Sequence, residues 1–216
     1  MFEPRNSVNT PGECEQYVNL VKICSWRRLP RLPWLPSLEA QTPWFGSELT
    51  HNTWSWKDDL HIDRRLYFGM ILASGAPAFA SLQFLPRLIA SQGDIDARTL
   101  HEKGLLAPNA LRVYEHIEKY GATATSALPF PHGSRMLYMA QLQQKFLIAK
   151  HDLTGRTRGK YGYRWCLCEH AFPTAFEKAS ALKVQDARAD VLNHLREFRR
   201  ELTMENVSAL FRWQSL

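Results

Sequence analysis

Residues 134–167 constrain the fold most, because three periodicities follow one another there without a break. Apolar residues at helical spacing run from Ser134, a typical N-cap, to Phe146. Residues 147–153 and 161–167 then alternate as strands do, and the glycine-containing stretch 154–160 separates them. A helix followed directly by a two-stranded hairpin predicts a winged-helix module, with a recognition helix and a β-hairpin wing.

The same stretch carries the excess charge of the chain. Residues 135–164 contain seven basic side chains and one acidic side chain, Asp152, so their net charge of +6 equals that of all 216 residues. Lysine and arginine side chains that contact phosphates supply the sequence-independent part of DNA affinity. The charge distribution therefore predicts that the hairpin turn and the helix before it bind DNA.

We expect an α+β protein that is mainly helical and has three parts. Residues 1–104 form an N-terminal region with a Trp- and Pro-rich segment and a small region of β-hairpin and helix. Residues 105–170 form the winged-helix module, a helix-turn-helix variant of three helices and a β-hairpin wing. Residues 171–216 form C-terminal helices packed on that module. No internal sequence repeat is visible.

Local signals support this division. Short strand-like runs on both sides of Ser74-Gly75 predict the N-terminal hairpin. An amphipathic helix opens at Pro108 and stops at Gly121, which makes it the first helix of the module. Thr203 has the position of an N-cap for the last helix.

The composition excludes several classes of protein. Four cysteines without a second ligand pair at zinc-finger spacing predict free thiols. The chain has no P-loop, GxGxxG or GxSxG motif, so we expect no cofactor. Residues 66–86 carry no charge, but prolines, glycines and polar side chains interrupt them, so we expect no membrane span. With no apolar signal segment at the start, we expect a cytoplasmic protein, nucleoid-associated if it is bacterial.

Ionisable side chains gather at one further place. Asp58, Asp59 and Asp63 lie near His51 and His61 in the sequence. No paired histidine spacing supports a metal site there. We therefore expect a solvated loop and no bound metal.

Several short motifs, in a fixed order, resemble those of a known family. They are Ser37-Leu-Glu-Ala40, Trp54-Ser-Trp56 followed by Asp58-Asp59, Phe79-Ala-Ser-Leu-Gln-Phe-Leu-Pro86, the segment 104–114, and Leu142-Gln143 followed by Phe146-Leu-Ile148. In these motifs the chain resembles the AlkZ-related proteins, short relatives of the AlkZ/YcaQ winged-helix DNA glycosylases. The resemblance covers most of the chain. It implies a winged-helix fold, DNA as the partner, and kinship with enzymes that excise alkylated bases.

The resemblance does not carry over to catalysis. The glycosylases position a water molecule with a glutamine-apolar-glutamine motif in an N-terminal hairpin. The only such string here is Gln141-Leu142-Gln143, in the middle of the expected recognition helix. Side chains two positions apart on a helix diverge. We therefore expect a DNA-binding protein that does not act as an enzyme.

We assign the DNA contacts to polar side chains of the module. Cations contact phosphates, while Ser134 and the glutamines read base edges. The assigned residues are Ser134, Arg135, Gln141, Gln144, Lys145, Lys150, Arg156, Arg158, Lys160 and Arg164.

Two other functions stay open. In the first, the chain is an active DNA glycosylase, and a pocket for an extruded damaged base is lined by Trp54, Trp56, Asp58 and Asp59. In the second, the winged helix docks a protein partner through the apolar Leu137 and Tyr138.

Overall fold

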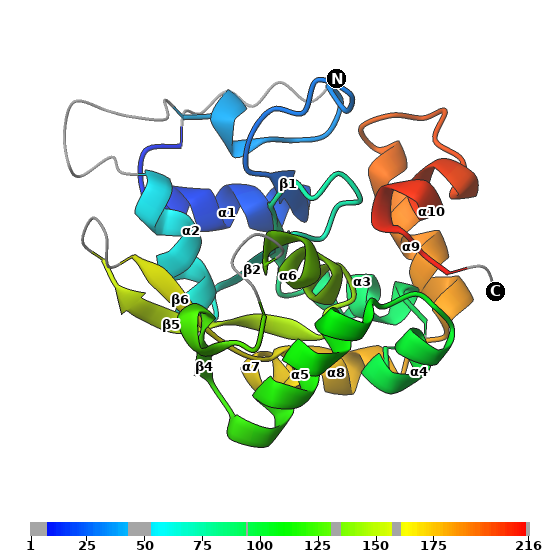
Figure 1. The fold of residues 1–216 in the computed structure, drawn as a ribbon. Coiled ribbons are helices and arrows are strands. Elements are labelled where there is room, and N and C mark those ends of the chain that lie inside the picture. The colour runs from blue at the N-terminus through cyan, green and yellow to red at the C-terminus, as the bar shows by residue number, and fades with distance from the viewer. Residues whose placement is uncertain (1–7, 43–52, 94, 131–134, 157–160, 215–216) are drawn as a thin grey trace.

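The computed structural model describes residues 8–42, 53–93, 95–130, 135–156 and 161–214 (Figure 1). It is an α+β structure in which helices flank two three-stranded antiparallel sheets. The mainly helical α+β class expected from the sequence is confirmed.

The first half of the chain forms one unit, which we call the first unit. Its elements are α1 (Pro11–Val21), β1 (Ile23–Ser25), the 3-10 helix η1 (Leu38–Ala40), α2 (Thr53–Ile62), β2 (Leu66–Gly69) and β3 (Ala78–Ser81). Strand β3 lies in the centre of the sheet, in the order β1-β3-β2. The expected N-terminal hairpin is confirmed, since Leu66 pairs with Ser81 and Gly69 with Ala78.

A second unit follows after α3 (Leu85–Ser91) and α4 (Ala97–Glu102). Its elements are α5 (Pro108–Tyr120), β4 (Thr123–Ala124), the 3-10 helix η3 (Thr125–Ala127), α6 (Arg135–Gln144), β5 (Ile148–Gly155) and β6 (Gly162–Leu167). The strand order is β4-β6-β5. In both units a helix, a strand, a 3-10 turn, a helix and a hairpin follow one another, and the last strand is central. The repeat therefore exists in topology, although no sequence repeat marks it.

The turn from helix to hairpin is the same in both units. After α2, Arg64 has φ 57°, and the amide of Arg65 donates to the carbonyl of Leu60 at 2.9 Å. After α6, Phe146 has φ 53°, and the amide of Leu147 donates to the carbonyl of Leu142 at 2.9 Å. Both are helix C-caps of the Schellman type, with a non-glycine residue in the left-handed region. This cap fixes the direction in which each hairpin leaves its helix.

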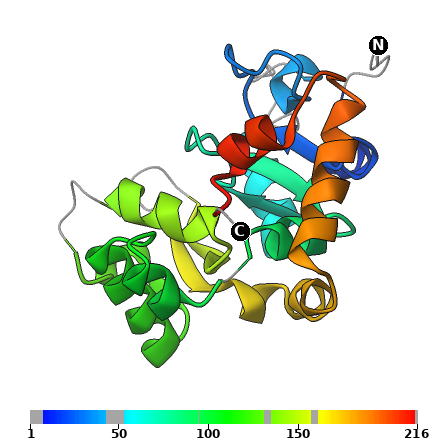
Figure 2. The same ribbon diagram turned by 90° about the vertical axis from the view of Figure 1, so that its right-hand side faces the viewer.

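The C-terminal helices pack largely on the first unit, and the first of them contacts the hairpin of the second unit. They are α7 (Cys168–Ala171), α8 (Pro173–Ser180), α9 (Val184–Arg196) and α10 (Met204–Phe211), the last capped by Thr203 as expected. Helices α8 and α9 pack on α3, and their apolar faces form one core cluster with Tyr67 and Ala80 of the first sheet. Figure 2 shows α9 and α10 (orange and red) beside the first unit, with the green helices of the second unit on the other side.

Each unit also has a core of its own. In the first unit, the opposite face of the sheet packs with Phe68 and Phe79 against α1 and α2. In the second unit, α4, α5 and α6 enclose Leu142, Ile148 and Trp165. Since both faces of the first sheet are buried, its strands contain no charged residue, which fits the uncharged stretch 66–86. Among the described helices, none combines the length and the apolar composition of a membrane span.

The sequence-based expectation was wrong for residues 53–62. They form helix α2 and not a solvated loop, because Trp56 and Leu60 are spaced by one helical turn and both enter the core of the first unit. Asp58 and His61 on this helix are completely buried, with exposed fractions of 0%. His51 lies outside the described residues. Among the described residues, no three His, Cys, Asp or Glu side chains converge as metal ligands would.

Candidate nucleic-acid interface

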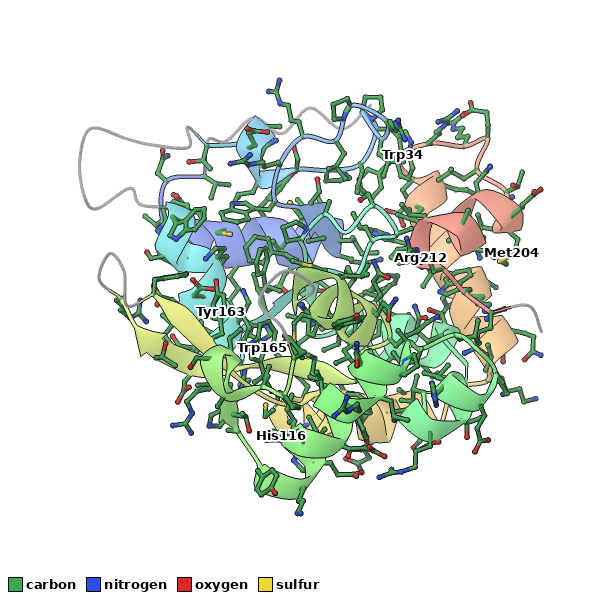
Figure 3. All side chains as sticks on the ribbon, viewed as in Figure 1. Trp34, His116, Tyr163, Trp165, Met204 and Arg212 are labelled. Carbon is green, nitrogen blue, oxygen red and sulfur yellow. The ribbon has the colours of Figure 1, made fainter. Side chains whose placement is uncertain are left out.

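The hairpin β5–β6 runs from the core into solvent. Ile148, Ala149 and Lys150 are buried, whereas the residues of β5 from His151 onwards are half-buried or exposed. Pairing continues to Gly155 and Gly162, with bulges on the way. In Figure 1 this hairpin leaves the body of the molecule on the side opposite to α9 and α10. Tyr163 and Trp165, which Figure 3 labels, lie along its second strand.

The corresponding hairpin of the first unit has no free end. Strands β2 and β3 are buried at every position. The connection between them is held by hydrogen bonds from the amide of Ala73 to the carbonyl of Leu210 at 2.8 Å and from Gln144 Nε2 to the carbonyl of Leu72 at 3.1 Å. Of the two hairpins, the one in the second unit is therefore the exposed one.

The cations of the exposed hairpin differ in their surroundings. Arg156 has an exposed fraction of 59% and binds Asp59 of α2 at 2.6 Å. Arg164 is half-exposed and lies 3.4 Å from Asp152 on the neighbouring strand. Arg158 and Lys160 lie outside the described residues. Surface ion pairs of this kind contribute about 0–1 kcal/mol, so a phosphate can compete with the carboxylates.

Near the C-terminus of α6, the polar residues that were expected to contact DNA point into the protein. Gln144 and Lys145 are buried, because this end of α6 packs against the first hairpin and the residues after α10. Lys145 Nζ donates to Gln92 Oε1 at 3.0 Å and to the carbonyl of Arg212 at 2.7 Å. Burial, with Arg188 and Arg212 nearby, lowers the pKa of Lys145 to about 8.

Nearer the start of α6 the surface is open. Leu137 has an exposed fraction of 60%. Arg135 begins the helix, and Ser134 lies outside the described residues. Gln141 is half-buried, and its Oε1 accepts from the amide of Ala107 at 3.3 Å. Among the described side chains of α6, Leu137 is thus the one that is mostly exposed.

A buried group of charges joins α2 of the first unit to the hairpin of the second. We call it the lysine-aspartate cluster, and its members are Lys57, Asp58, Lys150, Tyr161 and Tyr163. The two oxygens of Asp58 accept from Lys57 Nζ at 2.5 Å and from Lys150 Nζ at 3.1 Å. The Tyr161 hydroxyl also donates to Asp58, and Lys57 Nζ donates to the Tyr161 hydroxyl at 2.8 Å.

Two ammonium groups and one carboxylate leave the cluster with one net positive charge. Burial lowers the pKa of Lys150 to about 8, although Asp58 opposes this shift. Burial also lowers the pKa of Lys57, again against the attraction of Asp58. Burial raises the pKa of Tyr163 and keeps its hydroxyl protonated. The cluster therefore pairs both oxygens of Asp58 with donors inside the protein.

His61 makes a second connection between the two units. Its Nδ1 accepts from the amide of Phe68 at 2.8 Å, so its Nε2 carries the proton and donates to the carbonyl of Lys150 at 3.2 Å. Burial lowers the pKa of His61, which keeps the ring neutral. This histidine is a structural connector in a fixed tautomer.

Aromatic rings cover the ammonium groups of the cluster. Lys57 Nζ lies 4.6 Å from the ring centre of Trp54 and 5.2 Å from that of Trp26. Lys150 Nζ lies 4.3 Å from the ring centre of Tyr163 and 4.5 Å from that of Phe68. Such cation–π contacts offset part of the desolvation of a buried ammonium group.

The residues expected to line a base pocket do not converge. Trp54 has an exposed fraction of 41%, whereas Trp56 is a core residue with 2%. Asp58 faces the cluster, and Asp59 faces solvent with Arg156. Sequence reasoning gave no role to Lys57. The adjacent Lys57-Asp58 pair was the available signal, but only the helical conformation of this segment buries both side chains.

Together, these features define an α+β protein with two small antiparallel sheets, one of which ends in an exposed basic hairpin. The chain belongs to the AlkZ-related family, whose model, described as "AlkZ related", matches residues 8–212. This membership relates the chain to proteins of DNA alkylation repair. No curated protein and no solved structure matches the chain.

Proposed function

We propose that this chain is a winged-helix DNA-binding protein, related to alkylation-repair proteins, that binds duplex DNA through the β5–β6 hairpin without cleaving a glycosidic bond. The order α5, β4, α6, β5, β6, with a sheet in the order β4-β6-β5, supports the winged-helix assignment. In this assignment α6 corresponds to the recognition helix and the β5–β6 hairpin to the wing.

The contrast between the two hairpins carries the proposal. The same topology occurs twice, yet the first hairpin is buried and lies within an uncharged stretch, whereas the second reaches into solvent. Its turn, residues 156–160, contains Arg156, Arg158 and Lys160 and no acid. A fold that needed the hairpin only for packing would not require cations in the segment that joins its two strands. Cations in such a connecting segment suit the phosphates of a duplex.

The hydrogen bonds of individual residues reduce the set of side chains that we expect to contact DNA. Phosphate contacts are assigned to Arg156, Arg158, Lys160 and Arg164, and further contacts to Ser134 and Arg135 at the start of α6. Gln144, Lys145 and Lys150 are left out, because their polar groups are bonded inside the protein.

Two observations favour binding without catalysis. Gln141 and Gln143 bond to different segments, since one accepts from the amide of Ala107 and the other from the amide of Met70. The two amides therefore do not converge on one water molecule. The carboxylate of Asp58 forms ion pairs with Lys57 and Lys150 and is therefore not free to act on a substrate. Incubation with an alkylated duplex is accordingly expected to release no base.

The salt dependence of DNA affinity tests the proposal. Replacing Arg156, Arg158 and Lys160 together by Ala should reduce the slope of log K against log salt by up to about three phosphate contacts, roughly 2.7 units. The matched control replaces Lys178, Arg199 and Arg200, three exposed cations on the side of α8 and α9, and so removes the same charge. The control slope should stay that of the wild type. Equal slopes for both triple variants would refute a specific role of the hairpin.

A further inference from the structure

A second group of positive charges lies where α3, α6, α9 and the segment after α10 meet. We call it the arginine-lysine cluster, and its members are Lys145, Arg188 and Arg212. Figure 2 shows the segment after α10 (red) running back to the end of α6. Lys145 and Arg188 are more than nine-tenths buried, whereas Arg212 is exposed. The cluster therefore borders solvent at Arg212.

The hydrogen bonds of this cluster go to neutral oxygens. Arg188 Nε donates to the carbonyl of Ser91 at 2.8 Å, and Arg212 Nη1 donates to Gln144 Oε1 at 3.2 Å. Lys145 Nζ also donates to two neutral oxygens. Within the described part of the chain, none of the three cations forms an ion pair with a carboxylate. A buried charge is costly unless it is paired, so this cluster lacks a counter-ion.

Two buried donors beside these charges have no acceptor. Arg188 Nη2 and Trp213 Nε1 make no hydrogen bond. Their side chains are in contact, since the Arg188 guanidinium lies over the Trp213 ring at 5.2 Å from its centre. A buried N–H group without an acceptor is unusual, and one explanation is a water molecule or an ion that accepts from it. A water molecule would satisfy the donors but leave the charge, whereas an anion does both.

From these observations we propose that the arginine-lysine cluster binds a small oxyanion of the phosphate or sulfate class. The oxygens of such an ion accept from Arg188 Nη2 and Trp213 Nε1 while its charge balances that of the cations. Because Arg212 is exposed, its side chain can move to admit the ion. The bound ion would join α6 of the second unit to α9 and to the segment after α10. This site is separate from the β5–β6 hairpin, so the proposal goes beyond DNA binding and does not depend on it.

Isothermal titration of the full chain with sodium sulfate, at an ionic strength held constant with sodium chloride, tests the proposal. Sulfate is the probe because it keeps the same charge from neutral to alkaline pH. The wild type should bind sulfate at pH 7. The affinity should be about tenfold lower at pH 9, because Lys145, whose pKa is about 8, has then lost most of its proton. Arg188 and Arg212, the charged groups that act on this lysine, stay charged over this range.

Two variants of the site and one control locate the binding. Arg188→Lys keeps the charge but removes the Nη2 donor, and it should bind sulfate about tenfold more weakly. Trp213→Phe keeps a ring under Arg188 but removes the N–H group, so it should bind about fivefold more weakly. Arg196→Lys is the matched control on the same helix, because Arg196 Nε also donates to a backbone carbonyl, that of Leu202 at 2.9 Å. The control should bind sulfate as the wild type does.

The source of the anion is distinguished by titrating adenosine 5′-monophosphate and adenosine in the same way. Binding of the monophosphate but not of adenosine would assign the site to a phosphate group of a larger ligand, and binding of sulfate alone would assign it to a free ion. No sulfate binding by the folded wild type, the same affinity at pH 7 and pH 9, or equal losses in Arg188→Lys and Arg196→Lys would overturn the proposal. Thermal unfolding shows that each variant is folded. None of these outcomes bears on the binding of DNA by the hairpin.

Discussion

Among the described residues, three lysines are buried, and they are stabilised in different ways. Lys57 and Lys150 share the carboxylate of Asp58, whereas Lys145 bonds to two neutral oxygens, those of Gln92 and of the Arg212 backbone. A buried ammonium group is costly unless it is paired or hydrogen-bonded. The lowered pKa values of Lys145 and Lys150, both about 8, are the expression of that cost.

At the residue scale, the pH dependence of stability should report on Lys145. Its pKa is about 8 in the folded chain against an ordinary value of 10.5. Between these pH values the unfolded chain holds a proton that the folded chain has released, so raising the pH favours the folded state by up to about 1.4 kcal/mol per pH unit. Lys145→Met lacks this gain. Its free energy of unfolding should therefore decrease relative to the wild type from pH 8 to pH 10 in urea titrations. Parallel pH profiles would contradict the assignment.

The residue patterns did not predict the surroundings of every polar side chain. The assignment of Gln144 and Lys145 to DNA contacts required both side chains to face outward, and a helix on its own would expose them. The chain instead covers this end of α6 with the connection after β2 and with the residues that follow α10. Those contacts join residues far apart in the sequence, and local periodicity carries no information about them.

At the element scale, α2 and the β5–β6 hairpin are held together through Asp58. The aspartate lies on α2 of the first unit and its partner Lys150 on β5 of the second. This contact sets the orientation of the hairpin. The same hairpin is expected to bind DNA. The element pair is thus both a structural connection and the base of the proposed interface.

Replacing Asp58 should show how much this connection contributes to the free energy of unfolding. Asp58→Asn leaves two buried ammonium groups without a counter-ion, and the expected loss at pH 7 is about 3–5 kcal/mol. Asp59→Asn, its neighbour on the same helix, removes only the surface pair with Arg156 and should cost about 0–1 kcal/mol. Urea unfolding of both variants gives the comparison. A loss of under about 1 kcal/mol for Asp58→Asn would mean that the cluster does not hold the units together.

Elements with strong local signals were predicted well. The helix from Pro108, both hairpins and the Thr203 cap follow from alternation, amphipathic spacing and capping residues. Helix α2 was missed because Trp54 and Trp56 follow a proline-rich segment and two acids come next, which reads as an exposed loop. Part of its buried polar face is satisfied by partners in the other unit, such as Lys150.

At the scale of the whole molecule, one topology is used twice for different purposes. The first unit is buried on both faces of its sheet, and the C-terminal helices pack on it. The second unit keeps its hairpin exposed and carries the excess positive charge of the chain. Topological repetition of this kind is invisible in the sequence, because the two sheets bury different side chains. The family membership over residues 8–212 spans both units.

Hydrogen–deuterium exchange with and without a saturating DNA duplex compares the two hairpins in one experiment and shows which of them binds DNA. We expect duplex DNA to slow amide exchange in residues 151–164 of the second hairpin and to leave exchange in residues 66–81 of the first hairpin unchanged. Slower exchange in the first hairpin or in α9 and α10, without slower exchange in residues 151–164, would contradict DNA binding by the second hairpin.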